Sequence, residues 1–127
     1  MSNTLFINLD NLEKGNLFVT TSEGILKKYQ VNQKLLKSVE VLINENCPKI
    51  ETAPYHLLTT DAAPLLARGA LALSVMAKDD KGNLPNWHWK SDTIENVDEG
   101  NIVEAAEFVE KLVLVLDSVL PSFLLKK

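Results

Sequence analysis

The sequence predicts an α-rich α+β fold, in which a short N-terminal β-hairpin or meander precedes a bundle of three main helices. Three observations lead to this fold class. Short runs of β-forming residues occupy positions 1–31, a helical period of apolar residues begins at Asn32, and a long apolar run at 61–78 is typical of a buried central helix. The alternative is an all-α bundle, with residues 22–31 as an extra helix.

The N-terminal segment contains two candidate strands, TLFINL at residues 4–9 and NLFVTT at residues 16–21. Both runs are rich in β-branched and aromatic residues, which favour strands. The next run, GILKKYQV at 24–31, is expected to pair with the second strand as a hairpin. Ile25, Leu26 and Tyr29 would also suit a helical turn, so the helical alternative stays open for this run.

An amphipathic helix is predicted from Asn32, which is a suitable N-cap, to the residues before Pro48. Its apolar residues recur at a spacing that places them on one helical face. These residues are Leu35, Leu36, Val39, Leu42 and Ile43. We therefore expect this helix to pack on the core through a single face.

The run at residues 61–78 is interpreted as the central helix of the bundle. Asp61 is its expected N-cap, and Arg68 is the only charged residue between Ala62 and Ala77. A helix that is apolar nearly all round is either buried or spans a membrane, and this run is shorter than the ~20 apolar residues that a bilayer requires. Small residues at 63, 67, 70, 74 and 77 would let another helix, in this chain or in a second copy, approach closely.

The last helix is predicted at residues 102–120, with Asn101 as its N-cap and Pro121 as its break. Its polar residues collect on one arc of the helix. Leu114 lies in the middle of that arc, and we therefore expect it to be exposed and name it as a candidate contact residue.

Length and composition predict one domain over residues 1–127, with a small β element at 1–31 and a helical core at 32–127. The formal net charge is −4 and no basic cluster exceeds a pair of residues, which makes nucleic-acid binding by the chain alone unlikely. Cys47 is the only cysteine, and the N-terminus lacks the basic region of a signal peptide. We expect a cytoplasmic protein that does not bind membranes.

Catalytic and metal sites are not indicated by the residue pattern. Cys47, His56 and His88 have no neighbouring motif that would make a nucleophile and base pair, and no spacing of histidines and acids predicts a metal site. No motif indicates a cofactor either. The sequence therefore predicts a protein that is not an enzyme.

The candidate binding residues are Arg68, Trp87, His88, Trp89 and Leu114. Arg68 is either half of a structural ion pair with an acid such as Asp61 or Glu107, a snorkelling side chain, or a binder of anionic groups. If Trp87-His88-Trp89 is extended, both indoles lie on one side, where they either cover the core or form an aromatic anchor.

These features together predict a small soluble interaction protein that acts through protein–protein contacts, as an inhibitor, an immunity-type protein or a helical subunit of a larger assembly. Its partner would be another protein or a second copy of the chain. One alternative is a small-molecule-binding or enzymatic domain with a pocket near Arg68 and Trp87–Trp89. The other is a component of a nucleic-acid-handling complex.

Overall fold

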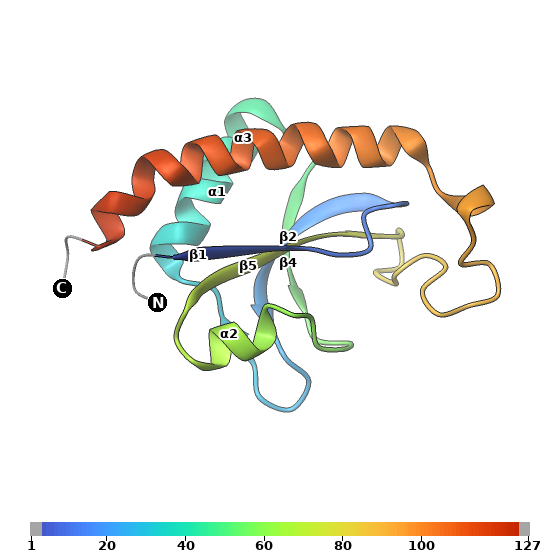
Figure 1. Cartoon of the computed structure of the whole chain (residues 1–127), viewed down its shortest axis with the longest axis horizontal. Helices are drawn as coiled ribbons and strands as arrows, with labels where there is room; N and C mark the ends of the chain where they lie inside the picture. Colours follow the sequence, from blue (N-terminus) through green and yellow to red (C-terminus); the bar gives the residue numbers. More distant parts are fainter. Residues whose placement is uncertain (1–3, 125–127) are drawn as a thin grey trace.

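The computed structural model describes residues 4–124 and has an α+β fold built on a five-stranded mixed sheet (Figure 1). The strands are β1 (Leu5–Leu9), β2 (Asn16–Glu23), β3 (Tyr29–Gln30), β4 (Glu51–Tyr55) and β5 (Leu71–Lys78). The helices are α1 (Gln33–Asn46), α2 (Ala63–Ala67) and α3 (Glu99–Leu124), and a short 3-10 helix covers Ile94–Asn96. The prediction of a helical bundle is therefore wrong, and so is the all-α alternative.

The sheet is ordered so that β5 lies between β1 and β2. β1 runs parallel to β5, whereas β2 runs antiparallel to β5. β4 pairs with β2 in parallel, and β3 makes a short antiparallel pair with β2 through two residues. The two strands expected near the N-terminus are present, but they are separated by β5 and do not form a meander with each other.

The largest correction concerns residues 61–78, because the expected central helix is a short helix followed by the central strand. Gly69, just beyond the end of α2, has a φ of 75° that is costly for other residues, and the N–H of Ala70 bonds to the carbonyl of Leu65 at 3.0 Å. Residues 72–77 of β5 are all buried. A strand covered on both faces is apolar without alternation, so its sequence resembles a buried helix. The spacing of small residues along 63–77 therefore marks no helical face.

α1 confirms the helix predicted after Asn32. The side chain of Asn32 accepts hydrogen bonds from the N–H groups of Lys34 and Leu35 at 3.0 and 3.1 Å. All five apolar residues of the expected face are buried. Capping and periodicity therefore agreed with the tertiary structure here.

α3 is longer at both ends than the predicted helix. Asp98, rather than Asn101, caps its first turn, since its Oδ1 accepts a hydrogen bond from the N–H of Asn101 at 3.2 Å. The Asn101 amide instead donates to the carbonyl of Leu12 at 2.6 Å. Pro121 lies inside the helix, close to its end at Leu124, so its missing N–H affects only the last turn.

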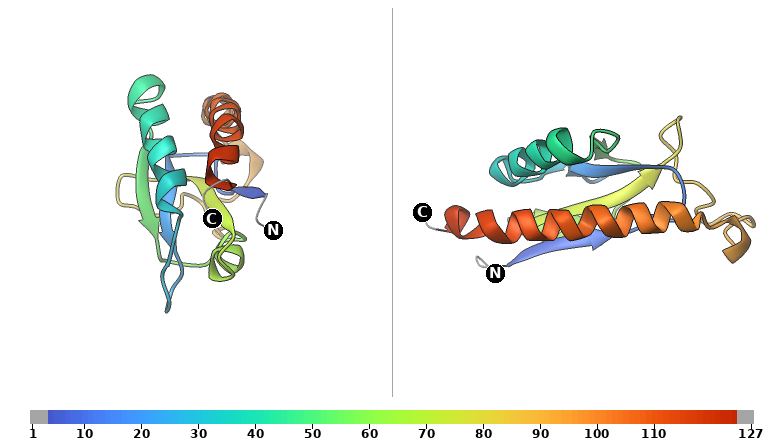
Figure 2. Two further views of the ribbon diagram at one scale, coloured as in Figure 1. Left: turned by 90° about the vertical axis from the view of Figure 1, so that its left-hand side faces the viewer. Right: turned by 90° about the horizontal axis from the view of Figure 1, so that it is seen from above.

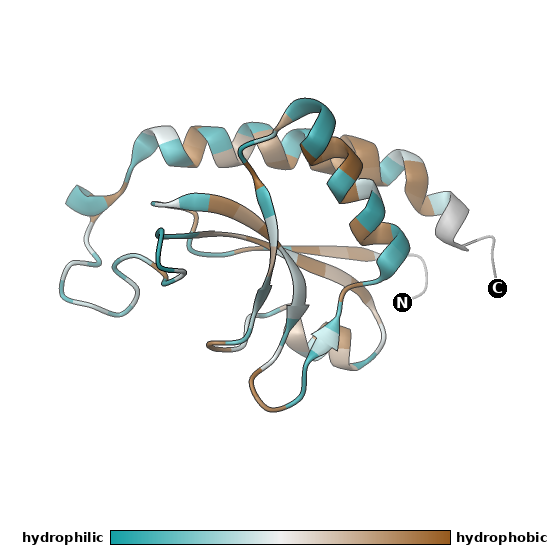
Figure 3. Cartoon of the chain, turned by 180° about the vertical axis from the view of Figure 1, so that it is seen from behind, coloured by the Kyte–Doolittle hydropathy of each residue, from teal (hydrophilic) through white to brown (hydrophobic). Residues whose placement is uncertain are grey.

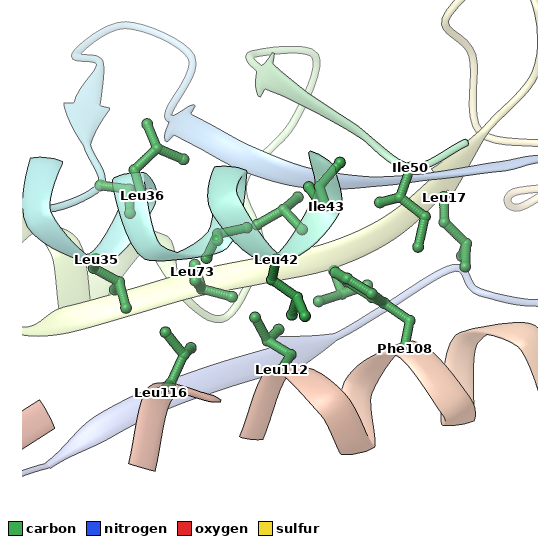
Figure 4. Close-up of a cluster of buried hydrophobic side chains, with 14 of the residues drawn as sticks. Leu17, Leu35, Leu36, Leu42, Ile43, Ile50, Leu73, Phe108, Leu112 and Leu116 are labelled. Atoms are coloured by element: carbon green, nitrogen blue, oxygen red, sulfur yellow. The ribbon is translucent and has the colours of Figure 1, made fainter. Parts of the chain in front are cut away.

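The main core lies between one face of the sheet and the two long helices (Figure 2). Leu35 and Leu42 of α1 point toward Leu112 and Leu116 of α3, above β5 (Figure 4). Apolar residues run along the central strands and along both long helices (Figure 3). A smaller cluster of Phe18, Tyr55 and Met76 covers part of the opposite face. Within residues 4–124, no helix has the combined length and apolarity needed to cross a membrane.

Candidate active site

The sheet face opposite α1 and α3 carries a strip of polar side chains. We call these residues the polar strip, and they are Asn8, Thr20, Glu23, Thr60 and Ser74. Side chains alternate between the two faces of a strand, so Thr20 and Ser74 lie opposite the apolar Val19 and Leu73 of the main core. All members except Asn8 are buried.

Glu23, at the end of β2, is the centre of the polar strip and is fully buried. The hydroxyls of Thr20 and Ser74 donate to its Oε2 at 3.1 and 3.0 Å, and the hydroxyl of Thr60 donates to its Oε1. Among residues 4–124 Glu23 forms no ion pair. Three hydroxyl donors therefore satisfy this buried carboxyl group in place of a cation.

Ser74 and Thr60 extend this network to β1 and to the segment before α2. The side-chain amide of Asn8 donates to Ser74 Oγ at 3.2 Å, and the Oγ atoms of Ser74 and Thr60 are 3.1 Å apart. Thr60 Oγ1 also accepts a hydrogen bond from the N–H of Ala62 at 3.1 Å. The network therefore joins the neighbourhoods of Asp10 and Asp61, which follow Asn8 and Thr60 in the sequence.

Asp10 and Asp61 form an acid pair beside the polar strip. Asp10 still reaches solvent, but burial of part of its carboxyl group raises the pKa, and the negative charge of Asp61 raises the pKa further. The backbone N–H of Asn11 opposes this rise by donating to Asp10. The effect of Asp61 on Asp10 means that the two carboxylates lie within range of each other's charge.

Tyr55 connects the acid pair to a neighbouring cavity. Burial raises the pKa of its phenol, and the negative charges of Asp10 and Glu23 raise that pKa further. The same residue lines a cavity of about 590 Å³, which we call the aromatic pocket. Its lining residues are Tyr55, Leu57, Leu58, Asp79, Asn83, Leu84, Pro85, Asn86, Trp87 and Trp89. This volume lies in the range of small-molecule sites.

The Trp87-His88-Trp89 stretch forms a turn, so the extended conformation on which the shared side of the two indoles depended is not found. Asn86 and His88 have φ angles of 58° and 56°, and the N–H of Trp89 bonds to the carbonyl of Asn86 at 3.0 Å. The rings of Trp87 and His88 stack with their centroids 3.8 Å apart. Trp89 is 74% exposed. Even so, both indoles line the aromatic pocket.

The structure does not bring the other candidate binding residues to this pocket. Arg68 is exposed at the end of α2, where its Nη1 donates to the carbonyl of Pro64 at 3.3 Å. In the described part of the chain it forms no ion pair, with Asp61, Glu107 or any other acid. Leu114 is 66% exposed on α3, which covers the other face of the sheet. Binding roles for Arg68, His88 and Leu114 remain predictions.

His56 makes a contact that resembles a nucleophile and base pair. Its Nε2 lies 3.1 Å from Ser22 Oγ, and its Nδ1 lies 2.9 Å from the carbonyl of Gly24. With Nδ1–H donating to the carbonyl, Nε2 accepts the Ser22 proton, as a general base would. Ser22 is only 4% exposed, however, so a substrate cannot reach its hydroxyl. We interpret the contact as a link between the β2–β3 turn and the end of β4.

Within residues 4–124, no three side chains of the types that bind metal ions gather closely enough to hold one. The acid pair therefore has no third side chain of these types close enough to complete a metal site among its described neighbours.

Asp10, Tyr55 and Asp61 were not among the binding residues predicted from the sequence. Asp10 directly follows a predicted strand, which is a common place for functional residues, because the ends of strands bring loop side chains together. Asp61 was interpreted as a helix cap, but the N-cap of α2 is Ala62, without a side-chain hydrogen bond. Tyr55 is the last residue of β4, which is an edge strand. Because β4 contains Pro54, which is unfavourable in most strands, this run was not predicted to be a strand.

The sequence matches the model of peptidase family M28 over residues 2–113. No curated protein and no solved structure matched. The match overturns the expectation of a non-enzymatic protein that acts through protein–protein contacts, because it points to a family of enzymes. It spans most of the sequence, including the acid pair, the polar strip and the aromatic pocket. This chain belongs to peptidase family M28.

Proposed function

We propose that this chain acts in peptide hydrolysis and that it binds the amino-terminal residue of a peptide between the acid pair and the aromatic pocket. One observation carries this proposal. In a member of a peptidase family, Tyr55 lines the aromatic pocket and also lies within range of the charge of Asp10. A surface that attracts cations therefore adjoins a surface that takes apolar groups.

The acid pair favours a positively charged ligand. Two neighbouring carboxylates repel each other, and the raised pKa of Asp10, which burial causes first and Asp61 second, reflects that cost. A peptide's α-ammonium group near both would relieve the repulsion and form charge-assisted hydrogen bonds. An acetylated amino terminus carries no charge and would give neither benefit.

The aromatic pocket favours an apolar side chain next to that ammonium group. Leu57, Leu58, Leu84 and the two indoles are among its apolar lining residues, while Asp79 and the asparagines supply polar groups. Aromatic walls provide a large contact area and lose little conformational entropy on binding. We expect phenylalanine or leucine to bind better than aspartate at this position.

A fluorescence titration tests the proposal, because Trp87 and Trp89 line the pocket and report on its occupancy. The probe is phenylalanyl-alanine amide, compared with its N-acetyl form. We expect saturable binding of the free amine and at least about tenfold weaker binding of the acetylated peptide, the loss expected for one charge-assisted contact. Asp61→Asn should weaken binding of the free-amine peptide by a similar factor.

The control is Glu45→Gln, which removes an exposed carboxylate from α1 on the other side of the sheet and should leave binding unchanged. Chromatography of the same mixtures would detect released phenylalanine, the product of hydrolysis. Equal binding of the free and acetylated peptides would contradict recognition of the amino terminus. No binding and no release of phenylalanine would contradict the whole proposal.

We also propose that the protein acts in the cytoplasm. Cys47 is the only cysteine and is not in a disulfide, which fits a reducing compartment.

A further inference from the structure

We propose that Glu23 is a positioning residue, which holds Asp61 beside Asp10 through the hydroxyl group of Thr60. The use of this arrangement for peptide binding rests on the proposed function. The hydrogen bonds of the polar strip connect Glu23 to the two segments that carry Asp10 and Asp61.

Both sequence neighbours of Asp61 are fixed by hydrogen bonds. Thr60 donates to Glu23, and its Oγ1 accepts from the N–H of Ala62 at 3.1 Å. The carbonyl of Thr60 also accepts from the N–H of Ala63 at 3.2 Å. Thr60 and Ala62 are buried, whereas Asp61 between them is exposed. The side chain of Asp61 therefore projects from a backbone segment that is tied to the sheet.

The segment that carries Asp10 is tied to the same carboxyl group from the other side. Asn8, two residues before Asp10, donates to Ser74 Oγ, and Ser74 Oγ donates to Glu23. The N–H of Asp10 bonds to the carbonyl of Val75 at 3.2 Å, which continues the β1–β5 pairing to this residue. Glu23 is therefore the shared contact through which the positions of both acids are related.

The chemistry of position 23 supports the same role. Three hydroxyl groups that donate together need a partner with several free lone pairs and no hydrogen of its own, which a carboxylate provides. A buried acid is costly compared with an apolar side chain of the same size. A role limited to filling space would not need this residue, whereas a role in fixing three hydroxyl groups does.

The test measures the pKa of Asp10 by NMR titration of the side-chain carboxyl carbons, without any peptide. Asp61→Asn removes the neighbouring charge and should lower the pKa of Asp10. Thr60→Val should also lower the pKa of Asp10, because Asp61 is no longer held in place. Thr60→Ser keeps the hydroxyl group and should retain the wild-type value.

Thr20→Val is the matched control, since it makes the same chemical change at a second hydroxyl that donates to Glu23. Thr20 lies in β2 and has no bond to the segment of Asp61, so this variant should keep the wild-type pKa of Asp10. Glu23→Gln should behave like Thr60→Val, and it provides the same test if Thr60→Val does not fold.

Three results would overturn the proposal. The first is a wild-type pKa of Asp10 in both Thr60→Val and Glu23→Gln. The second is a fall in the pKa of Asp10 in Thr20→Val that is as large as the fall in Thr60→Val. The third is an unchanged pKa of Asp10 in Asp61→Asn. The expected pattern combined with a failure to bind peptide would reject the proposed function alone. The two proposals can therefore fail separately.

Discussion

At the scale of single residues, the acid pair links function to stability. Burial of part of its carboxyl group, with a smaller effect from the Asp61 charge, raises the pKa of Asp10 above its usual 3.8. The folded protein therefore binds this proton more tightly than the unfolded chain does. The contribution of Asp10 to stability is present below pH 3.8 and is lost as the pH rises through the folded pKa.

Asp10→Asn should consequently change how stability depends on pH. The asparagine cannot ionise, so it avoids the cost that wild type incurs when Asp10 loses its proton. Relative to wild type, the variant should gain free energy of unfolding between about pH 3 and neutral pH. Urea denaturation of both proteins across this range measures the difference. Glu45→Gln should show no such gain, and a gain of equal size there would refute the assignment to Asp10.

At the scale of secondary-structure elements, α1 depends on its cap. Asn32 accepts two backbone hydrogen bonds in the first turn. Asn32→Ala should lower the free energy of unfolding by about 1 kcal/mol, because both N–H groups lose their partner. Chemical denaturation measures this loss.

Asn44→Ala is the control on the same helix, because Asn44 is exposed and alanine is the better helix former there. Its effect should stay within about 0.5 kcal/mol. If both variants lost the same free energy, the cap would not be the cause.

The contrast between α1 and β5 shows what local sequence can predict. The cap and the single apolar face of α1 have only one simple interpretation, and the structure agrees with it. The run that contains β5 is apolar without alternation because other elements cover both faces, and that fact depends on residues far away in the sequence. β4 was not predicted for a similar reason, because the run ETAPY becomes a strand only by pairing with β2.

In the candidate site, too, the features that depend on distant residues could not be predicted from local sequence. The two tryptophans were identified from the sequence because tryptophan is common in binding sites, and both line the aromatic pocket. Asp10, Tyr55 and Asp61 come from three different segments of the chain, and only the sheet brings them together. Arg68 was prominent because its surroundings were interpreted as a buried helix, an interpretation that the exposed end of α2 removes.

At the scale of the whole molecule, α3 should stabilise the fold through its inner face alone. Leu112 is fully buried between α1 and the sheet, whereas Leu114 is 66% exposed on the same helix. Leu112→Ala should lower the free energy of unfolding by about 2–5 kcal/mol, through lost burial and the cavity that remains. Leu114→Ala should change it by less than about 0.5 kcal/mol. Equal losses in urea denaturation would show that α3 does not pack as described.

The pairing of β1 with β5 also affects how the protein is made. Asn8 and Ser74, which face each other across these strands, are 66 residues apart in the chain. At roughly 5–20 residues per second, a ribosome needs about 3–13 seconds to synthesise that interval. During this time β1, with its leucines, phenylalanine and isoleucine, has no strand to pair with. The nascent chain therefore exposes an aggregation-prone segment until β5 emerges. A chaperone would protect β1 during this period.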